Sequence, residues 1–171
     1  QQVEGAVAQN AKAKPQAVIM VTLSKPTAEF VQQMRKAGQS PQFSTLSPIG
    51  ADFRVTEMGA KEAHGIGISQ AMPYPWNDTL PIVKEYHKAL QAFAKHGNYS
   101  YYGLEGFINA KLMAEAIRRT GKDLTREKLV NALESSNFDL GGYKLGYTPA
   151  SHNGSHFVDL TVLSRDGRVL R

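Results

Sequence analysis

The sequence predicts an α/β domain in which a parallel sheet is flanked by helices. Over the first 70 residues, short extended runs alternate with longer segments of helical periodicity, the order that produces parallel strands joined by crossover helices. The length of 171 residues, with 42% hydrophobic and 20% charged residues, suits a globular domain with its own core. Because the chain has no cysteine, disulfides, thiolate nucleophiles and cysteine-bound zinc are excluded.

The first part of the chain supplies the helix and strand alternation. Apolar residues at helical spacing predict a helix over residues 3–14, which Pro15 ends. The apolar run 17–21 predicts a strand that is buried on both faces. A helix from Ser24 to Gly38 follows. The remaining elements expected here are an extended segment at 42–46, a weak helix over 51–59 and a strand at 65–69.

A proline-rich segment then interrupts the alternation. Pro73 and Pro75 flank Tyr74 within residues 72–78, and neither proline can donate a hydrogen bond to a strand ladder. We interpret residues 72–78 as a semi-rigid crossing between two structural units.

The next segment is helical. A helix is expected over 79–95, and residues 99–134 predict two further helices joined by a polar turn, with Thr125 as the N-cap of the last. The helix before that turn is apolar on two sides, so it is expected to lie between two layers. Its two apolar sides consist of Phe107, Ala110, Met113, Ala114 and Ile117, and of Ile108, Leu112 and Ala116.

The C-terminal region changes to strands. Residues 140–148 and 156–163 predict an antiparallel hairpin around the loop 149–154. Asp166 and Gly167 form a further predicted turn before the last extended residues. The expected fold class is therefore α/β with a C-terminal antiparallel hairpin.

No catalytic or metal-binding motif stands out. The segment Gly65-Ile66-Gly67 has Gln70 where a dinucleotide-binding loop needs its third glycine. His152 and His156 lie in a loop without further ligands at suitable spacing, which favours surface histidines over a metal site. The formal charge is +5, with cations and anions interspersed along the helices, and this argues against nucleic-acid binding. The sequence thus indicates a protein that is not an enzyme and that uses neither metal nor cofactor.

Several segments, taken in order, resemble one family. Residues 102–111 (YGLEGFINAK), 124–134 (LTREKLVNALE) and 139–143 (DLGGY) resemble the extracytoplasmic substrate-binding proteins of ABC transporters. Within these proteins, the resemblance is to the branched-chain amino acid (Leu/Ile/Val-binding) group. Residues 14–19, 65–70 and 158–162 agree with it, so that it covers nearly the whole chain.

The resemblance implies a type I periplasmic binding fold, in which two α/β lobes joined by a hinge close around a small ligand. It also implies that this chain is incomplete and corresponds to the C-terminal part of a longer protein. The helices after the hinge would then lack their sheet, so we expect an exposed apolar patch and either self-association or a longer parent molecule. The implied organisation is second-lobe elements at 1–71, a hinge crossing at 72–78, first-lobe helices at 79–138, and the hinge return with second-lobe strands at 139–171.

The resemblance also implies where a ligand binds. The second lobe is expected to contribute the loops after its strands, here Thr22, Leu23 and Ser24, and Ser47, Pro48, Ile49 and Gly50. Pro73, Tyr74 and Pro75 would belong to the hinge. Leucine-binding members carry an aromatic residue and a carboxylate in the two loops, near the positions of Leu23 and Pro48 here. This departure puts a standard α-amino acid in doubt and leaves other small acids, including aromatic ones, open.

The function implied by the resemblance is solute capture for an ABC uptake system. The ligand would be a branched-chain amino acid or a related small acid, and the partner an ABC permease in the membrane of a bacterium. The alternative is the ligand-sensing domain of a receptor or transcriptional regulator with the same fold. Residues 1–17 lack the basic segment and apolar run of a signal peptide. One expectation is therefore that the chain is a mature form or an internal fragment of a periplasmic or otherwise extracytoplasmic protein. The other is that the protein is cytoplasmic.

Overall fold

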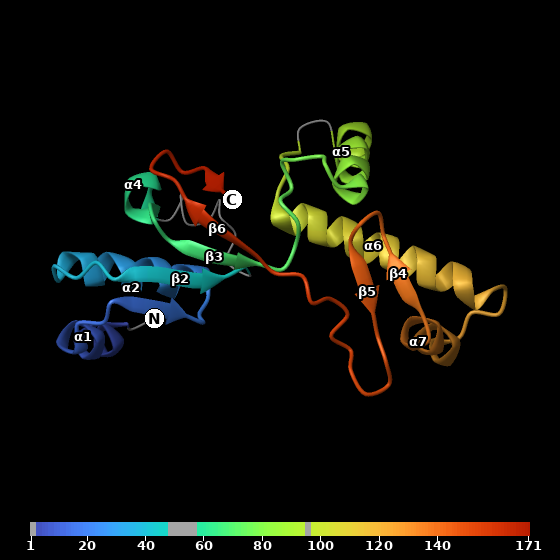
Figure 1. Ribbon diagram of the computed structural model, residues 1–171, viewed down its shortest axis with the longest axis horizontal. Coiled ribbons are helices and arrows are strands. Elements are labelled where there is room, and N and C mark those ends of the chain that lie inside the picture. Colours follow the sequence, from blue (N-terminus) through green and yellow to red (C-terminus); the bar gives the residue numbers. More distant parts are fainter. Residues whose placement is uncertain (1–2, 48–57, 95–96) are drawn as a thin grey trace. The chain divides into compact units, whose positions relative to one another are not determined.

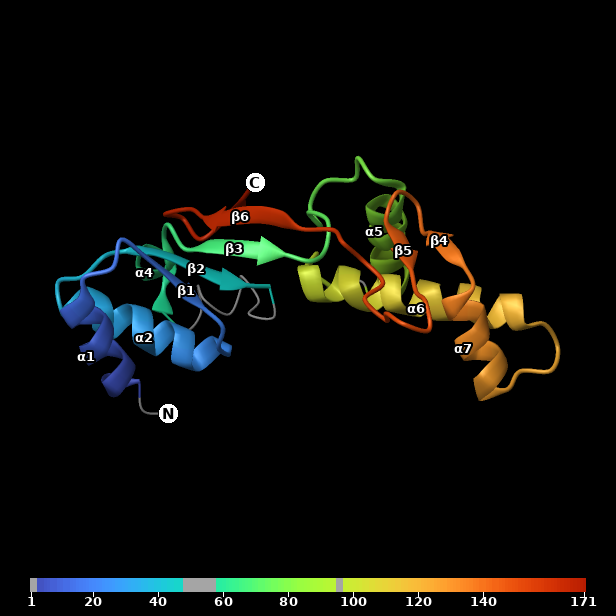
Figure 2. The same ribbon diagram turned by 60° about the horizontal axis from the view of Figure 1, so that its bottom comes forward.

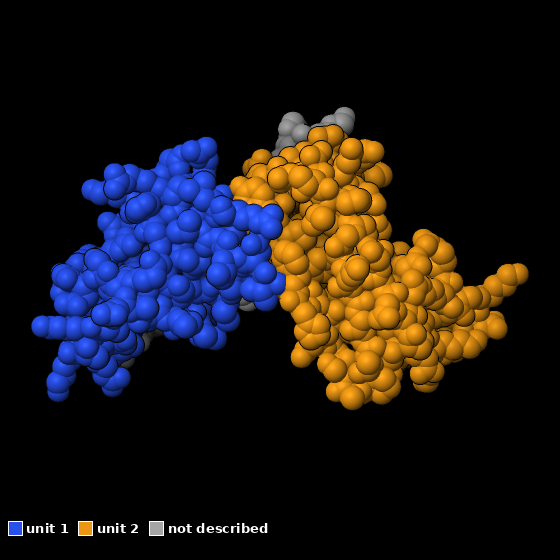
Figure 3. Space-filling model, in the orientation of Figure 1, with its two compact units in different colours: residues 1–71, 158–171 blue, residues 72–157 orange. Residues whose placement is uncertain are grey.

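The computed structural model describes residues 3–47, 58–94 and 97–171. The chain divides into two compact units, which Figure 3 shows in different colours. Unit 1 comprises residues 1–71 and 158–171, and unit 2 comprises residues 72–157. The expected crossing at 72–78 thus begins at the unit boundary. Residues 139–157, which the sequence analysis assigned to the return segment, belong to unit 2.

Unit 1 is built on a five-stranded mixed sheet with the strand order β1-β2-β3-β6-β7 (Figure 1). The β1–β2 and β2–β3 pairs are parallel, whereas β3–β6 and β6–β7 are antiparallel. The predicted parallel sheet with flanking helices is therefore confirmed. The elements are α1 (Glu4–Ala13), β1 (Ala17–Met20), α2 (Ser24–Lys36), β2 (Gln42–Leu46), α4 (Ala60–Ala63), β3 (Gly67–Gln70), β6 (Asp159–Leu163) and β7 (Val169–Leu170).

Helices cover one face of this sheet. The ring of Phe30 on α2 meets the ring of Phe43 on β2 edge to face, with centroids 6.4 Å apart. The Arg35 guanidinium, at the end of α2, donates hydrogen bonds to the carbonyl oxygens of Glu62 and His64 and so holds α4 beside it. This packing explains the helical spacing of the buried residues of α2, namely Thr27, Ala28, Phe30, Val31 and Met34.

The other face of the sheet is exposed among the described residues. In β1, the Met20 side chain is buried, but the neighbouring Ile19 side chain points to the opposite face and is 77% exposed. The prediction that this strand is buried on both faces is wrong for this chain. A continuous apolar run indicates two covering layers, and the described residues supply only one of them.

The described part of unit 2 consists of three helices and a short β-hairpin (Figures 1 and 2), and it has a core of its own. The predicted helices are present. Thr125 is the N-cap of the last helix, as expected, and its Oγ1 accepts a hydrogen bond from the Lys128 amide at 3.2 Å. The elements are α5 (Pro81–Phe93), α6 (Tyr101–Thr120), α7 (Arg126–Glu134), β4 (Asn137–Asp139) and β5 (Lys144–Gly146). The core contains Ile82, Val83, Tyr86, Leu104, Ile108, Leu112, Ala116, Phe138, Leu140, Tyr143 and Leu145.

Helix α6 has one packed side and one exposed side. Ile108, Leu112 and Ala116 are buried in the core of unit 2. Met113 and Ile117, from the other predicted apolar side, are 44% and 38% exposed. The two-sided pattern is thus real, but only one of its two layers is present in the described part of unit 2.

The predicted hairpin of residues 140–148 and 156–163 is wrong in its pairing. Strand β5 pairs with β4, and β6 pairs with β3 and β7. The chain reverses earlier than expected because Gly141 and Gly142 have positive φ angles, which glycine adopts without strain. Their amides donate to the Asp139 carboxylate at 3.1 and 2.7 Å. An antiparallel hairpin does end the chain, but it is formed by β6 and β7.

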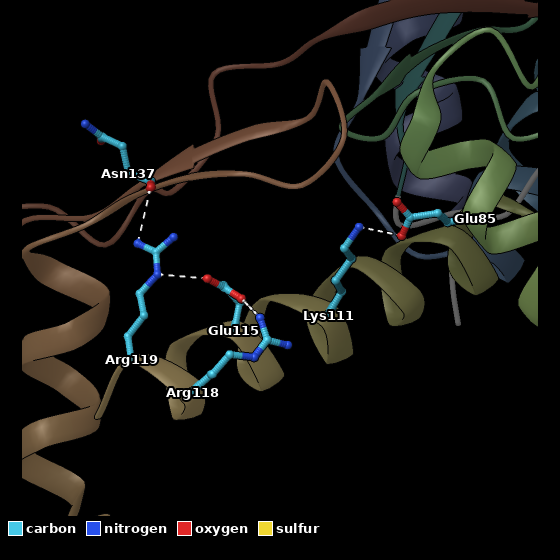
Figure 4. Close-up of polar contacts among 6 residues, drawn as sticks. All are labelled: Glu85, Lys111, Glu115, Arg118, Arg119 and Asn137. Carbon is cyan, nitrogen blue, oxygen red and sulfur yellow. Dashed lines mark hydrogen bonds and ion pairs between the residues drawn. The ribbon is translucent and has the colours of Figure 1, made fainter. Parts of the chain in front are cut away.

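Charged side chains fasten α6 to its neighbours within unit 2 (Figure 4). Lys111 pairs with Glu85 of α5. The Arg119 Nε donates to Glu115 at 3.1 Å, and its Nη1 donates to the carbonyl oxygen of Asn137 at 3.4 Å. Helix α6 is therefore connected to α5 at one point and to β4 at another.

Candidate ligand-binding site

The carboxyl ends of the parallel strands of unit 1 form the candidate site. Strands β1, β2 and β3 run in the same direction, and the register places Met20 beside Thr45, and Thr45 beside Ile68. Open α/β sheets bind ligands in the loops at this edge. The predicted residues Thr22, Leu23 and Ser24 follow β1, and Ser47 follows β2. The structure therefore brings Thr22, Leu23 and Ser24 and the described residue of the second loop, Ser47, to the same end of the sheet.

The loop after β1 presents an exposed apolar side chain at the start of a helix. Leu23 is 69% exposed and is the N-cap residue of α2, where it makes no side-chain capping hydrogen bond. The Thr27 amide and hydroxyl both donate to the Leu23 carbonyl oxygen, at 3.1 and 2.9 Å. These two hydrogen bonds hold the loop after β1 against the first turn of α2.

The first turn of α2 has a positive electrostatic character. It contains no acidic residue, and Lys25 is exposed there. Because Pro26 has no amide hydrogen and the Thr27 amide bonds to the Leu23 carbonyl, the backbone donors of this turn are the amides of Ser24 and Lys25. The amide hydrogens at a helix start, together with the helix dipole, favour a negatively charged group. The loop thus combines an apolar contact with an environment that suits a carboxylate.

The second predicted loop is described only in part. Ser47 is half-buried directly after β2. Pro48, Ile49 and Gly50 lie outside the described residues, as does most of the weak helix expected over 51–59. Their proposed contacts with a ligand stay predictions.

Buried polar side chains lie at the same end of the sheet, on its covered face. Gln70, the last residue of β3, is 2% exposed, and its Nε2 donates to the Thr161 Oγ1 at 3.1 Å. The Thr161 hydroxyl in turn donates to the Ile68 carbonyl oxygen at 3.3 Å. Thr45 is also buried, and its Oγ1 has no hydrogen-bond partner among the described residues. Sequence reasoning missed these residues, because only the strand register brings Gln70 and Thr161 together.

The predicted hinge residues begin unit 2. Pro73 and Pro75 are buried, and the carbonyl oxygen of Pro75 lies 2.7 Å from the Nε2 of His87 on α5. The His87 ring stacks on Tyr99 with a centroid distance of 3.8 Å. This segment is therefore attached to the helical layer of unit 2.

Three aromatic rings gather at the same segment. The Tyr74 ring lies 5.1 Å from Trp76 and 6.5 Å from Tyr101 at the start of α6, and the Trp76 ring lies 5.6 Å from Tyr101. Of these three residues, only Tyr74 was predicted as a hinge residue. The signal that could have found the others is the number of aromatic residues in the two segments 72–78 and 99–102.

The shifted pKa values in the described residues belong to turns and to the core of unit 2. The hydrogen bond from the Gly142 amide lowers the pKa of Asp139, and the Ser164 hydroxyl lowers the pKa of Asp166 in the β6–β7 turn. Burial raises the pKa of Tyr143. Each of these groups has a structural role, and none lies in the two candidate loops.

Other parts of the described chain offer little further chemistry. His152 is exposed, and its Nε2 lies 2.8 Å from the Glu134 carboxylate. This pair borders a largely apolar cavity of about 410 Å³ next to α6 and α7, which none of the predicted ligand residues lines.

Within residues 3–47, 58–94 and 97–171, no three histidine, aspartate or glutamate side chains gather in an arrangement suited to a metal ion. None of the helices described has the length and apolarity that crossing a bilayer requires.

Comparisons with known proteins agree on one family. The family described as periplasmic binding protein matches residues 1–168. A substrate-binding periplasmic protein from Ralstonia solanacearum is 34% identical, with a TM-score of 0.86. A possible leucine/isoleucine/valine-binding protein from Rhodopirellula baltica SH 1 is 30% identical, with a TM-score of 0.89. An extracellular ligand-binding receptor from Verminephrobacter eiseniae is 29% identical, with a TM-score of 0.83. The search of curated proteins gives no match.

These comparisons also concern length. Each match covers 98% or 99% of this chain, but only 47% to 49% of the three solved chains. The chain thus spans about half the length of the solved structures that it matches.

Proposed function

Because the chain belongs to the periplasmic binding protein family, we propose that it supplies the second-lobe part of the ligand site in a solute-binding component of an ABC uptake system. The observation that supports this proposal is that Thr22, Leu23 and Ser24, which follow β1, and Ser47, which follows β2, lie at the carboxyl end of parallel strands. The whole protein binds its solute without catalysis and passes it to an ABC permease from an extracytoplasmic position.

The ligand that we propose is a small carboxylic acid with an apolar body. The exposed Leu23 side chain offers an apolar contact, and the first turn of α2 suits a carboxylate. A branched-chain amino acid has this chemistry, and so does an aromatic acid. The Rhodopirellula baltica relative is described as a possible leucine/isoleucine/valine-binding protein, which supports the first class.

Lobe closure is the proposed means of capture. Residues 72–78 form the hinge crossing, with Pro73, Tyr74 and Pro75 as its central residues. Residues 1–71 then belong to the second lobe, and the helices of 79–138 belong to the first. Ser47, Pro48, Ile49 and Gly50 form the second contact loop for the ligand.

A thermal-shift experiment on the full-length two-lobed protein tests this function. Leucine, isoleucine, valine, benzoate and phenylacetate would be added separately, and a ligand present at 100 times its Kd stabilises the folded state by about 2.7 kcal/mol. We expect stabilisation by at least one of these acids and a weaker effect in Leu23→Asp, which places a like charge beside the carboxylate. Lack of stabilisation by every member of the panel would argue against solute binding.

A sensor role is the second candidate function. The Verminephrobacter eiseniae structure is described as an extracellular ligand-binding receptor, and the same fold can present a ligand site to a signalling partner. The sequence ahead of this part of the protein separates the two roles. A signal peptide there favours uptake, whereas a DNA-binding helix-turn-helix favours regulation.

A further inference from the structure

His87 of α5 contacts the hinge crossing and the segment before α6 at the same time. The Pro75 carbonyl oxygen lies 2.7 Å from its Nε2, and since a carbonyl oxygen only accepts, the His87 Nε2 is the donor. The His87 ring is also stacked on the Tyr99 ring, with 3.8 Å between the centroids and 12° between the planes. The Tyr99 hydroxyl in turn accepts a hydrogen bond from the Gln91 Nε2 at 3.0 Å. The imidazole of His87 is therefore held both at its edge and on its face.

Helix α5 is itself fixed in unit 2. Ile82 is fully buried in the core of this unit, and the Tyr86 hydroxyl accepts a hydrogen bond from the Ser100 amide at 3.3 Å. Pro75 is thus connected to unit 2 twice, along the chain through the start of α5 and through space by the hydrogen bond from His87. The part of the crossing that follows Pro75 is consequently held on the helical layer.

The chain before the crossing is fixed in unit 1. Strand β3 ends at Gln70, which pairs with Asp159 of β6. The Gln70 side chain is buried, and its Nε2 donates to the Thr161 Oγ1 at 3.1 Å. Residues 71–74 connect this fixed point to Pro75. The two fixed points therefore divide the proposed crossing into a short connecting part and a part that belongs to unit 2.

We propose that His87 is a positioning residue of the hinge, which holds Pro75 on unit 2 and confines the rotation of lobe closure to residues 71–74. This inference rests on the proposed function, since it concerns the closure of two lobes around a ligand. Closure orders the hinge, and ordering each backbone residue costs free energy. Because His87 shortens the segment that closure must order, the closed form is reached at a lower cost and the ligand binds more tightly.

Binding to the full-length two-lobed protein tests the proposal. The probe is the acid that stabilises the wild type among leucine, isoleucine, valine, benzoate and phenylacetate. His87→Phe keeps a ring that can stack on Tyr99 but has no hydrogen to donate, whereas His87→Gln keeps an N–H donor. His87→Phe should raise the Kd at least about fivefold, which corresponds to one hydrogen bond, and His87→Gln should bind more tightly than His87→Phe. His87→Met, which also lacks an N–H donor, should raise the Kd to the same extent as His87→Phe.

Trp76 provides a second measurement that needs no ligand. In a full-length variant that retains Trp76 as its sole tryptophan, the ring reports on the motion of the residue next to Pro75. His87→Phe should lower the residual fluorescence anisotropy of Trp76 in the unliganded protein, because the segment gains motion, and His87→Gln should lower it less. Lys88→Phe is the matched control, since Lys88 is exposed on α5. It should change the Kd by less than about twofold and leave the anisotropy unchanged.

An unchanged Kd for both His87→Phe and His87→Met would overturn the proposal, since His87 would then only stabilise unit 2. So would an unchanged anisotropy of Trp76 in these variants, or an effect of Lys88→Phe as large as that of His87→Phe. If no acid of the panel binds to the wild type, the proposed function fails on its own account. The anisotropy of Trp76 then still decides whether His87 holds the crossing on unit 2.

Discussion

Single residues determine where the chain reverses in unit 2. The Gly141 carbonyl oxygen accepts a hydrogen bond from the Ile82 amide at 3.0 Å, so the β4–β5 turn rests on the start of α5. Gly141 has a φ of 91°, a conformation that costs other residues about 1–2 kcal/mol. The position requires glycine for both its backbone angle and its close approach to the helix.

Gly141→Ala should lower the free energy of unfolding by at least about 2 kcal/mol. The added Cβ would lie 2.9 Å from the Ile82 amide nitrogen, and the positive φ would be strained. Gly106→Ala is the control, because its Cβ meets nothing within 4 Å and alanine favours a helix by about 1 kcal/mol. Urea unfolding measures both. Equal stability of the two variants would contradict the role assigned to the turn.

Asp139 should make the stability of unit 2 dependent on pH. The Gly142 hydrogen bond lowers its pKa below the ordinary value of 3.8. Because the pKa is lower in the folded state, the stabilisation is complete above pH 3.8, and it is lost as the pH falls through the lower folded-state value. Asp139→Asn should therefore be less stable than the wild type at pH 7, and the difference should shrink below about pH 4.

Urea unfolding at pH 7 and pH 3 measures this difference. Asp123→Asn serves as the control, since the Asp123 side chain is 89% exposed and lies 3.8 Å from the Nζ of Lys128. A difference between the wild type and Asp139→Asn that is the same at both pH values would show that the carboxylate charge does not stabilise the turn.

At the scale of elements, α6 joins the parts of unit 2. Its buried side packs in the core, while Arg119 reaches β4 through the Asn137 carbonyl oxygen and lies 4.2 Å from the centroid of the Phe138 ring. The opposite side carries Met113 and Ile117. A helix with apolar residues on two sides is suited to a middle layer. The hydrogen bond from Arg119 to Asn137 and the packing of its guanidinium on the Phe138 ring hold α6 against β4.

Arg119→Ala should destabilise the chain by about 1–2 kcal/mol, because it removes the contact with the Phe138 ring and the hydrogen bond to β4. Arg118→Ala is the matched control, since Arg118 pairs only with Glu115 among the contacts in Figure 4 and its side chain is 74% exposed. A surface ion pair of this kind contributes about 0–1 kcal/mol.

Arg119→Lys should restore little of the loss, since a lysine lacks the planar guanidinium. Denaturant unfolding of the three variants provides the measurement. If Arg118→Ala proved as destabilising as Arg119→Ala, the connection between α6 and β4 would not be the stabilising contact.

At the scale of the whole molecule, each unit leaves an apolar surface exposed in the part of the chain that the structure describes. One is the sheet face of unit 1 that carries Ile19 and Leu160, and the other is the side of α6 in unit 2 that carries Met113 and Ile117. Surfaces of this kind mark association sites. The chain also matches only 47% to 49% of each of the three solved chains.

The hinge assignment predicts an optical signal. Trp76 is the only tryptophan in the sequence, and its ring lies against Tyr74 and Tyr101. In the full-length protein, saturation with a ligand should change the tryptophan emission of a variant that retains Trp76 as its sole tryptophan, because closure alters the surroundings of the hinge. Stabilisation by a ligand without any change in this emission would place the moving segment elsewhere than residues 72–78.

Local patterns in the sequence were enough to determine helices α1, α2, α5, α6 and α7, the capping of α7 by Thr125, and the ends of β1 and β2, because helical periodicity, capping and strand ends depend on neighbouring residues. The family resemblance then assigned those loops to a ligand. Strand pairing was decided only by the tertiary structure. Gln70 and Thr161 lie 91 positions apart, and no local pattern shows that β6 pairs with β3 instead of β5. The exposure of Ile19 and Met113 was decided there too, since burial depends on which layers are present.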